Sequence, residues 1–181
     1  GRVDFGPNTM LVNIADIKKG TGLWKNFSFQ GQVHFDGLEL TAPVSAEFKL
    51  TNAGSRILAD GTVATTARLL CCRCAEPFEH PLTVEVQESF VPEDSREVPR
   101  EDLQLEDLSI FTYREDRLEF DEILRQNLIA ALPVKPLCRP DCRGLCDQCG
   151  QNLNQKACNC SGEEIDPRWG PLLKLKQNPG G

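Results

Sequence analysis

Six of the nine cysteines of this 181-residue chain lie between Cys138 and Cys160. Cys146 and Cys149 have two residues between them and a glycine directly after, the pattern of a zinc knuckle. Both thiolates can face one ion, and Cys158 with Cys160 can complete a tetrahedral shell from the other side. Soft sulfur ligands favour zinc or an iron–sulfur cluster over hard cations. A bound metal is therefore expected here, because the segment has too few large apolar side chains to fold without one.

A second pair, Cys71 and Cys74, also has two intervening residues. Strand alternation points Cys71 inward, where one cysteine can be buried as a small apolar residue. Three cysteines in four residues fit metal ligation better, with Cys72 as the unpaired ninth thiol. A competing division puts a single metal within 138–160 and leaves the earlier pair reduced, so we expect one or two Zn²⁺. Our preferred division gives one site Cys71, Cys74, Cys138 and Cys142, and the other Cys146, Cys149, Cys158 and Cys160.

The composition limits the compartment and the partners. No secretory leader opens the chain, so reduced thiols and a cytoplasmic location are expected, and the odd cysteine count agrees. No run of about 18 apolar residues occurs, so we expect no membrane span. The net charge is −7, but residues 123–181 carry eight basic residues against five acidic ones. Non-specific nucleic-acid binding by the whole surface is excluded, and any RNA contact is directed to the C-terminal third.

Alternating apolar residues predict an antiparallel meander over residues 44–50, 57–71 and 82–90. Asp60 and Gly61 indicate a bulge or kink in the middle strand. A hairpin is expected over 108–120. Asp121 should then cap a helix that runs to about Leu132 and lies across the sheet.

These elements predict an α+β fold, an antiparallel β-sheet or partial barrel packed by one main helix, with a small C-terminal zinc-bound lobe. Residues 1–9 are expected to be a cloning remnant or disordered. Residues 10–136 should form the α+β domain. Residues 137–181 should form the cysteine-rich zinc lobe, which ends in a short helix.

One pattern suggests an enzyme. The spacing of Cys142, Cys146 and Cys149 matches the motif that holds the cluster of iron–sulfur radical enzymes, but those enzymes build a barrel downstream, and only 32 residues follow Cys149. No phosphate loop, serine-hydrolase or zinc-protease motif occurs. Closed shells of four thiolates leave no position for a catalytic water. We therefore expect no enzyme activity.

Three segments, residues 70–78 (LCCRCAEPF), 130–138 (AALPVKPLC) and 142–154 (CRGLCDQCGQNLN), together resemble the YceD family of large ribosomal RNA subunit accumulation proteins. The closing Asp-Pro-Arg at 166–168 fits the same pattern. The resemblance implies a bacterial or plastid protein needed for accumulation or processing of 23S rRNA. It implies no catalytic residues.

We therefore expect a noncatalytic ribosome-biogenesis factor whose basic C-terminal surface contacts 23S rRNA or a pre-50S particle. The acidic loop at 93–107 is expected to contact a basic ribosomal protein. The alternative is a zinc-lobe protein–protein adaptor that does not contact RNA. The candidate contact residues are Arg139, Arg143, Lys156, Arg168, Lys174 and Lys176.

Overall fold

The computed structural model describes residues 4–6, 9–95 and 110–160. No helix in these ranges combines the length and the apolarity needed to cross a membrane. The elements, in chain order, are β1 (Asp4–Gly6), β2 (Thr9–Asn13), the 3-10 helix η1 (Ile17–Lys19), β3 (Trp24–Gly31), β4 (Val44–Asn52), β5 (Ile57–Leu70), β6 (Pro77–Pro92), β7 (Ile110–Tyr113), β8 (Arg117–Glu119) and α1 (Asp121–Ala130).

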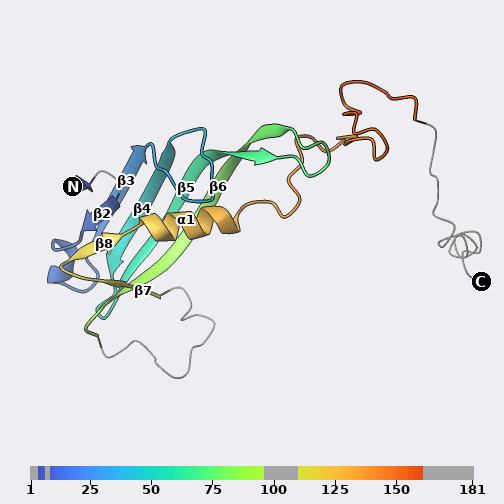
Figure 1. Ribbon diagram of the computed structural model, residues 1–181. Helices are drawn as coiled ribbons and strands as arrows, with labels where there is room; N and C mark the ends of the chain where they lie inside the picture. The colour runs from blue at the N-terminus through green and yellow to red at the C-terminus, as the bar shows by residue number, and fades with distance from the viewer. Residues whose placement is uncertain (1–3, 7–8, 96–109, 161–181) are drawn as a thin grey trace, which may run out of the picture.

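The described residues form two sheets (Figure 1). The larger has the order β3-β4-β5-β6-β7, with antiparallel neighbours except for the parallel pair β6 and β7. The smaller has the order β1-β2-β8. The predicted antiparallel meander is confirmed in β4, β5 and β6. The larger sheet is open, with β3 and β7 at its edges, and is not the partial barrel that the sequence suggested.

The helix α1 lies across one face of the larger sheet, as predicted (Figure 1). Leu124 and Leu128 are fully buried on its inner side. Phe120, directly before the helix, is also fully buried, with its ring centroid 4.9 Å from that of Phe48 and 5.4 Å from that of Phe90. These rings tie β4 and β6 to the helix start, because large aromatic side chains bury the most apolar area per residue.

Gly61 does not form the predicted bulge. The pairing runs without interruption from Phe48 on β4 through Gly61 on β5 to Val86 on β6. A Cβ at Gly61 would lie 2.4 Å from Cδ1 of Phe48 and 2.2 Å from the backbone oxygen of Glu47. Glycine is therefore required because the Phe48 ring lies against the β5 backbone at this point.

Of the hairpin predicted over 108–120, the turn is confirmed, but the pairing of its two strands with each other is wrong. Glu115 and Asp116 adopt left-handed conformations, with φ of 49° and 60°, and a single bridge joins Arg114 to Arg117. The chains then diverge, because β7 pairs with β6 and β8 pairs with β2. This turn therefore connects the two sheets.

The predicted side-chain cap of α1 is also wrong. Phe120 holds the cap position without a side-chain hydrogen bond, and the helix begins at Asp121. The Oδ2 atom of Asp121 accepts a hydrogen bond from the backbone N–H of Met10 at 2.7 Å. The carboxylate thus joins β2 to the helix and also lies favourably at the positive end of the helix dipole.

The β5–β6 hairpin extends beyond the rest of the sheet. β4 pairs with β5 only up to Ala64, whereas β6 pairs with β5 as far as Leu70. The cysteine-rich segment lies at the far end of this hairpin (Figure 1). This long hairpin thus places Cys71 and Cys74 away from the hydrophobic core and close to the cysteine-rich segment of residues 138–160 (Figure 1).

Candidate metal centres

The turn between β5 and β6 positions the first pair of cysteines. The N–H of Cys71 donates to the carbonyl of Glu76 at 3.0 Å, and the N–H of Ala75 donates to the carbonyl of Cys71 at 2.9 Å. Ala75 has a φ of 58°, a left-handed conformation that tightens the turn. Cys71 and Cys74 are both buried as a result.

A segment more than sixty residues further along the chain completes this group. The N–H of Cys72 donates to the carbonyl of Pro136 at 2.8 Å, which holds the approaching chain against the turn. The Sγ atoms of Cys71 and Cys142 are 3.7 Å apart, and those of Cys74 and Cys138 are 3.8 Å apart. Four sulfurs bonded at about 2.3 Å to one tetrahedral ion lie about 3.8 Å from one another. The spacing therefore fits a tetrathiolate metal site.

The thiols of this first centre do not share one environment. Backbone N–H donation, first of all from Cys138, lowers the pKa of Cys71 to about 6. Burial, together with the neighbouring Cys142, Cys71 and Cys74 sulfurs, raises the pKa of Cys138 to about 12. Crowded thiols resist losing all their protons unless a cation compensates the charge, and metal binding supplies that cation.

The second centre is built on the knuckle. The N–H of Gly150 donates to the carbonyl of Cys146, and the N–H of Cys146 to the carbonyl of Gln151, both at 2.8 Å. Gly150 has a φ of 70°. Backbone N–H groups, first that of Cys149, lower the pKa of Cys146 to about 7. The sulfurs of Cys146, Cys149, Cys158 and Cys160 lie within 4.8 Å of one another.

The two centres differ in exposure. In the first, Cys71, Cys74 and Cys142 are buried, with Phe78 and Leu137 packed against them. In the second, only Cys146 is buried. The first centre is thus part of a small core of its own, whereas the second lies near the surface.

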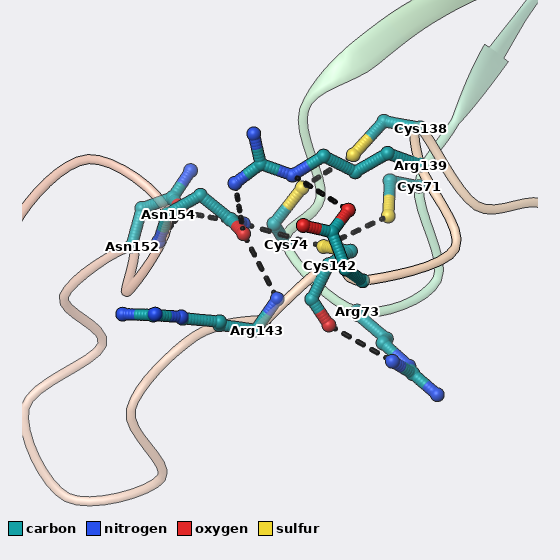
Figure 2. A network of polar contacts seen from close by, with 10 residues as sticks. Cys71, Arg73, Cys74, Cys138, Arg139, Cys142, Arg143, Asn152 and Asn154 are labelled. Atoms are coloured by element: carbon teal, nitrogen blue, oxygen red, sulfur yellow. Dashed lines mark hydrogen bonds and ion pairs between the residues drawn. The ribbon is translucent and has the colours of Figure 1, made fainter.

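A polar network surrounds the first centre and reaches Asn152 and Asn154, which follow the knuckle in the chain (Figure 2). The Asn154 Nδ2 atom donates to Sγ of Cys142 at 3.2 Å. Its Oδ1 atom accepts hydrogen bonds from the Arg139 guanidinium at 2.7 Å and from the N–H of Arg143 at 2.8 Å. Asn154 therefore connects the loop of the first centre to the segment that follows the knuckle.

The β5–β6 turn contributes three further contacts to this network. The N–H of Leu145 donates to the carbonyl of Arg73 at 3.0 Å, and the Arg73 Nη1 atom donates to the carbonyl of Cys142 at 2.9 Å. The Glu76 carboxylate accepts from the side-chain amide of Asn152 at 3.3 Å. Sequence reasoning missed these residues, and Asn154 with them, since neither spacing nor charge distinguished them from solvent-exposed loop residues.

The structure groups all eight cysteines named from the sequence into two sets of four, and each set could hold a metal ion. That these cysteines bind metal remains a prediction. Cys72 is exposed, and neither it nor His80 belongs to either set.

Three of the six basic residues named from the sequence lie in the described ranges, and three do not. Asn154 accepts hydrogen bonds from the Arg139 guanidinium and from the backbone N–H of Arg143. The Nε atom of Arg139 also lies 3.5 Å from Oδ1 of Asp141. Lys156 is exposed close by in the chain, two residues after Asn154. The other three basic residues lie outside the described ranges: Arg168, Lys174 and Lys176.

The acidic loop at 93–107 is described only over residues 93–95. Within this part, Glu93 forms an ion pair with Arg114.

An uncharacterized protein of Mycobacterium tuberculosis is 29% identical over 174 residues, which cover 92% of this chain and 81% of the relative. A chloroplastic protein of Arabidopsis thaliana, named large ribosomal RNA subunit accumulation protein YCED homolog 1, is 25% identical over 75% of this chain and 49% of its own length. Its namesake in Zea mays is 23% identical over 75% of this chain and 54% of its own length. No solved structure matches.

The family model for the large ribosomal RNA subunit accumulation protein YceD matches residues 59–176. This range begins in β5, contains all nine cysteines and includes each of the three segments that carry the resemblance. The family is named for an accumulation factor and not for an enzyme. The chain belongs to the YceD family of large ribosomal RNA subunit accumulation proteins.

Proposed function

We propose that this protein is a noncatalytic factor in the biogenesis of the large ribosomal subunit, acting on 23S rRNA in the cytoplasm, with one structural zinc ion in each cysteine centre. The observation that supports it most is the grouping of four sulfurs within 4.8 Å of one another in each centre, in a chain of this family. Zinc has no redox chemistry and suits closed thiolate shells. Its role here is to fold the segment that follows α1.

The zinc-folded segment would present the RNA-binding residues. Asn154 holds the Arg139 guanidinium and the backbone N–H of Arg143, so the Arg139 side chain and the Arg143 backbone are positioned before any partner binds. A preorganised guanidinium group suits phosphate oxygens, and such contacts weaken steeply as salt concentration rises. Lys156, Arg168, Lys174 and Lys176 would extend this surface along 23S rRNA or a pre-50S particle.

Elemental analysis of the full chain, purified anaerobically, tests the metal half of this proposal. We expect two zinc ions per chain and a colourless protein. An iron–sulfur cluster would instead give a brown protein that absorbs visible light. A metal-free chain that retains an ordered 138–160 segment would contradict the proposal.

Association with pre-50S particles tests the RNA half. We expect the triple change Arg139→Glu, Arg143→Glu and Lys156→Glu to abolish ultraviolet crosslinking to 23S rRNA while the zinc content stays at two. The matched control is Arg56→Glu, an exposed residue at the opposite end of β5 from the cysteines. Unchanged crosslinking in the triple variant would refute the RNA surface.

A protein–protein adaptor is the second candidate. Four thiolates around Zn²⁺ leave a charge of about −2 on each centre, which offsets the nearby arginines and weakens the attraction for phosphate. An adaptor would remain associated with the particle through a ribosomal protein and give no crosslink to RNA. The same ultraviolet experiment therefore separates the two candidates.

A further inference from the structure

The strand β6 is paired along one side and largely open along the other. It pairs with β5 from Pro77 to Phe90. On the opposite side, β7 pairs only with Ser89–Pro92. Within the described part of the chain, no strand and no hydrogen bond uses the backbone of β6 on that side between residues 78 and 88.

The direction of the free backbone groups follows from the pairing. Thr66 and Arg68 on β5 exchange backbone hydrogen bonds with residues 39–41, away from β6. Their partners on β6, Pro81 and Glu79, must therefore point their own backbone groups away from β5. Because the direction alternates, the open side also carries the N–H and C=O groups of Thr83, Glu85 and Gln87. Proline is tolerated at position 81 for the same reason, since an edge strand needs no donor there.

The side chains of β6 give this open edge a distinct chemistry. Among its sixteen residues are Glu79, Glu85 and Glu88, and none is a lysine or arginine. Glu79 and Glu85 are exposed on the sheet face opposite α1. On the other face, Phe78 and Val84 are half-buried and apolar, and His80 and Glu88 lie on this face as well. A strand added between residues 79 and 87 would meet carboxylates on one face and mainly hydrocarbon on the other.

We propose that this open side of β6, from residue 79 to residue 87, is the docking site for an extended segment of a partner protein that alternates lysine or arginine with aliphatic residues. The segment adds to the larger sheet as a strand. The backbone of β6 supplies its hydrogen bonds, and the carboxylates select its basic side chains. A second copy of this chain is disfavoured as the occupant, because antiparallel pairing of two β6 edges brings glutamates together.

This site contains none of the eight cysteines and none of the proposed RNA-contact residues, and among the described residues it meets the first centre only through Phe78 at its end. Its test uses the full chain and a nine-residue probe peptide that alternates lysine with valine. In an added strand, either all lysine amides or all valine amides face β6. We expect N-methylation of one set to weaken binding by about tenfold or more, and methylation of the other set to change it by less than about twofold. Equal effects of the two methylations would overturn the proposal, because charge attraction alone cannot distinguish them.

Two protein variants sharpen the result. Thr83→Pro removes an outward N–H at a position equivalent to Pro81, and we expect about tenfold weaker peptide binding with unchanged zinc content. Glu85→Lys should weaken binding comparably. Its matched control is Glu47→Lys, an exposed glutamate in the same cross-strand row but two strands away from the edge. An equal loss in the Glu47 and Glu85 variants would count against docking at this edge.

Amide hydrogen exchange supplies the last measurement. The N–H groups of Thr83, Glu85 and Gln87 should exchange rapidly in the free protein and become protected when the peptide binds. Slow exchange in the free protein would show that the chain already covers this edge, and would overturn the proposal. Since the readout is peptide binding, its failure leaves the proposed role with 23S rRNA untouched.

Discussion

Replacement of Asn154 tests whether its hydrogen bonds stabilise the first centre. The Asn154 side chain makes four hydrogen bonds, to Cys142 Sγ, Asn152, Arg139 and Arg143. Neutral hydrogen bonds contribute about 0.5–1.5 kcal/mol net, and exposed contacts contribute less. Asn154→Ala should therefore cost the first centre about 2 kcal/mol, which corresponds to roughly 30-fold weaker metal binding.

Asn154→Asp separates the contacts. It keeps an acceptor for Arg139 and Arg143 but places a carboxylate oxygen where the amide donated to the Cys142 sulfur at 3.2 Å. Like charges repel there, so the Asp variant should bind the first ion more weakly than the Ala variant does.

Competition with a zinc chelator measures the affinities, and cadmium NMR, which gives one resonance per centre, assigns the loss to the first centre. Asn26→Ala on β3, far from both centres, is the control. If the Asp variant held zinc as tightly as the native chain, donation from the amide to sulfur would contribute nothing, and the reasoning would fail.

Three further outcomes are expected. Gly61→Ala should lower the free energy of unfolding, measured in urea, by about 3 kcal/mol, because the new Cβ would overlap Phe48 and the β4 backbone. A decrease below about 1 kcal/mol would mean that the Phe48 ring moves aside freely. Asp121→Ala should cost about 1–2 kcal/mol by removing the acceptor of the Met10 N–H, and Asp121→Asn should recover part of it. Burial raises the pKa of Glu88, whose Oε2 has no hydrogen-bond partner. When the pKa of a carboxyl group is raised in the folded protein, its ionisation at higher pH destabilises the fold. Glu88→Gln removes this cost, so it should raise the melting temperature at pH 7 and have little effect at pH 3, where the carboxyl group is already neutral.

Much of the fold could be predicted from local pattern. Period-two alternation located β4, β5 and β6, and the apolar spacing after Asp121 located α1. The cysteine spacings named all eight members of the two centres, because two thiols separated by one to three residues can reach one ion through a single turn. In each case the information lies within a few consecutive residues.

What failed concerned contacts between distant segments. Asp60 and Gly61 were interpreted as a bulge or kink, and the bulge is absent; nothing near Gly61 in the sequence shows that Phe48 lies against it. The strands after 108 were paired with each other, yet β7 and β8 belong to different sheets. Asn154 was overlooked, because its role depends on Arg139 and Cys142 lying beside it.

The sequence by itself determined which residues form strands and helix and which side chains are thiols, since backbone sterics and the side-chain period act locally. Only the tertiary structure decided between the preferred division, in which Cys71 and Cys74 meet Cys138 and Cys142, and a single site within 138–160. It also decided that, among the described residues, no strand pairs with one side of β6 before Ser89. Those outcomes depend on where the extended β5–β6 hairpin ends in space and on how far β7 follows its neighbour. The position of the hairpin end and the extent of the β6–β7 pairing both depend on how the whole core packs. No short stretch of sequence contains that information.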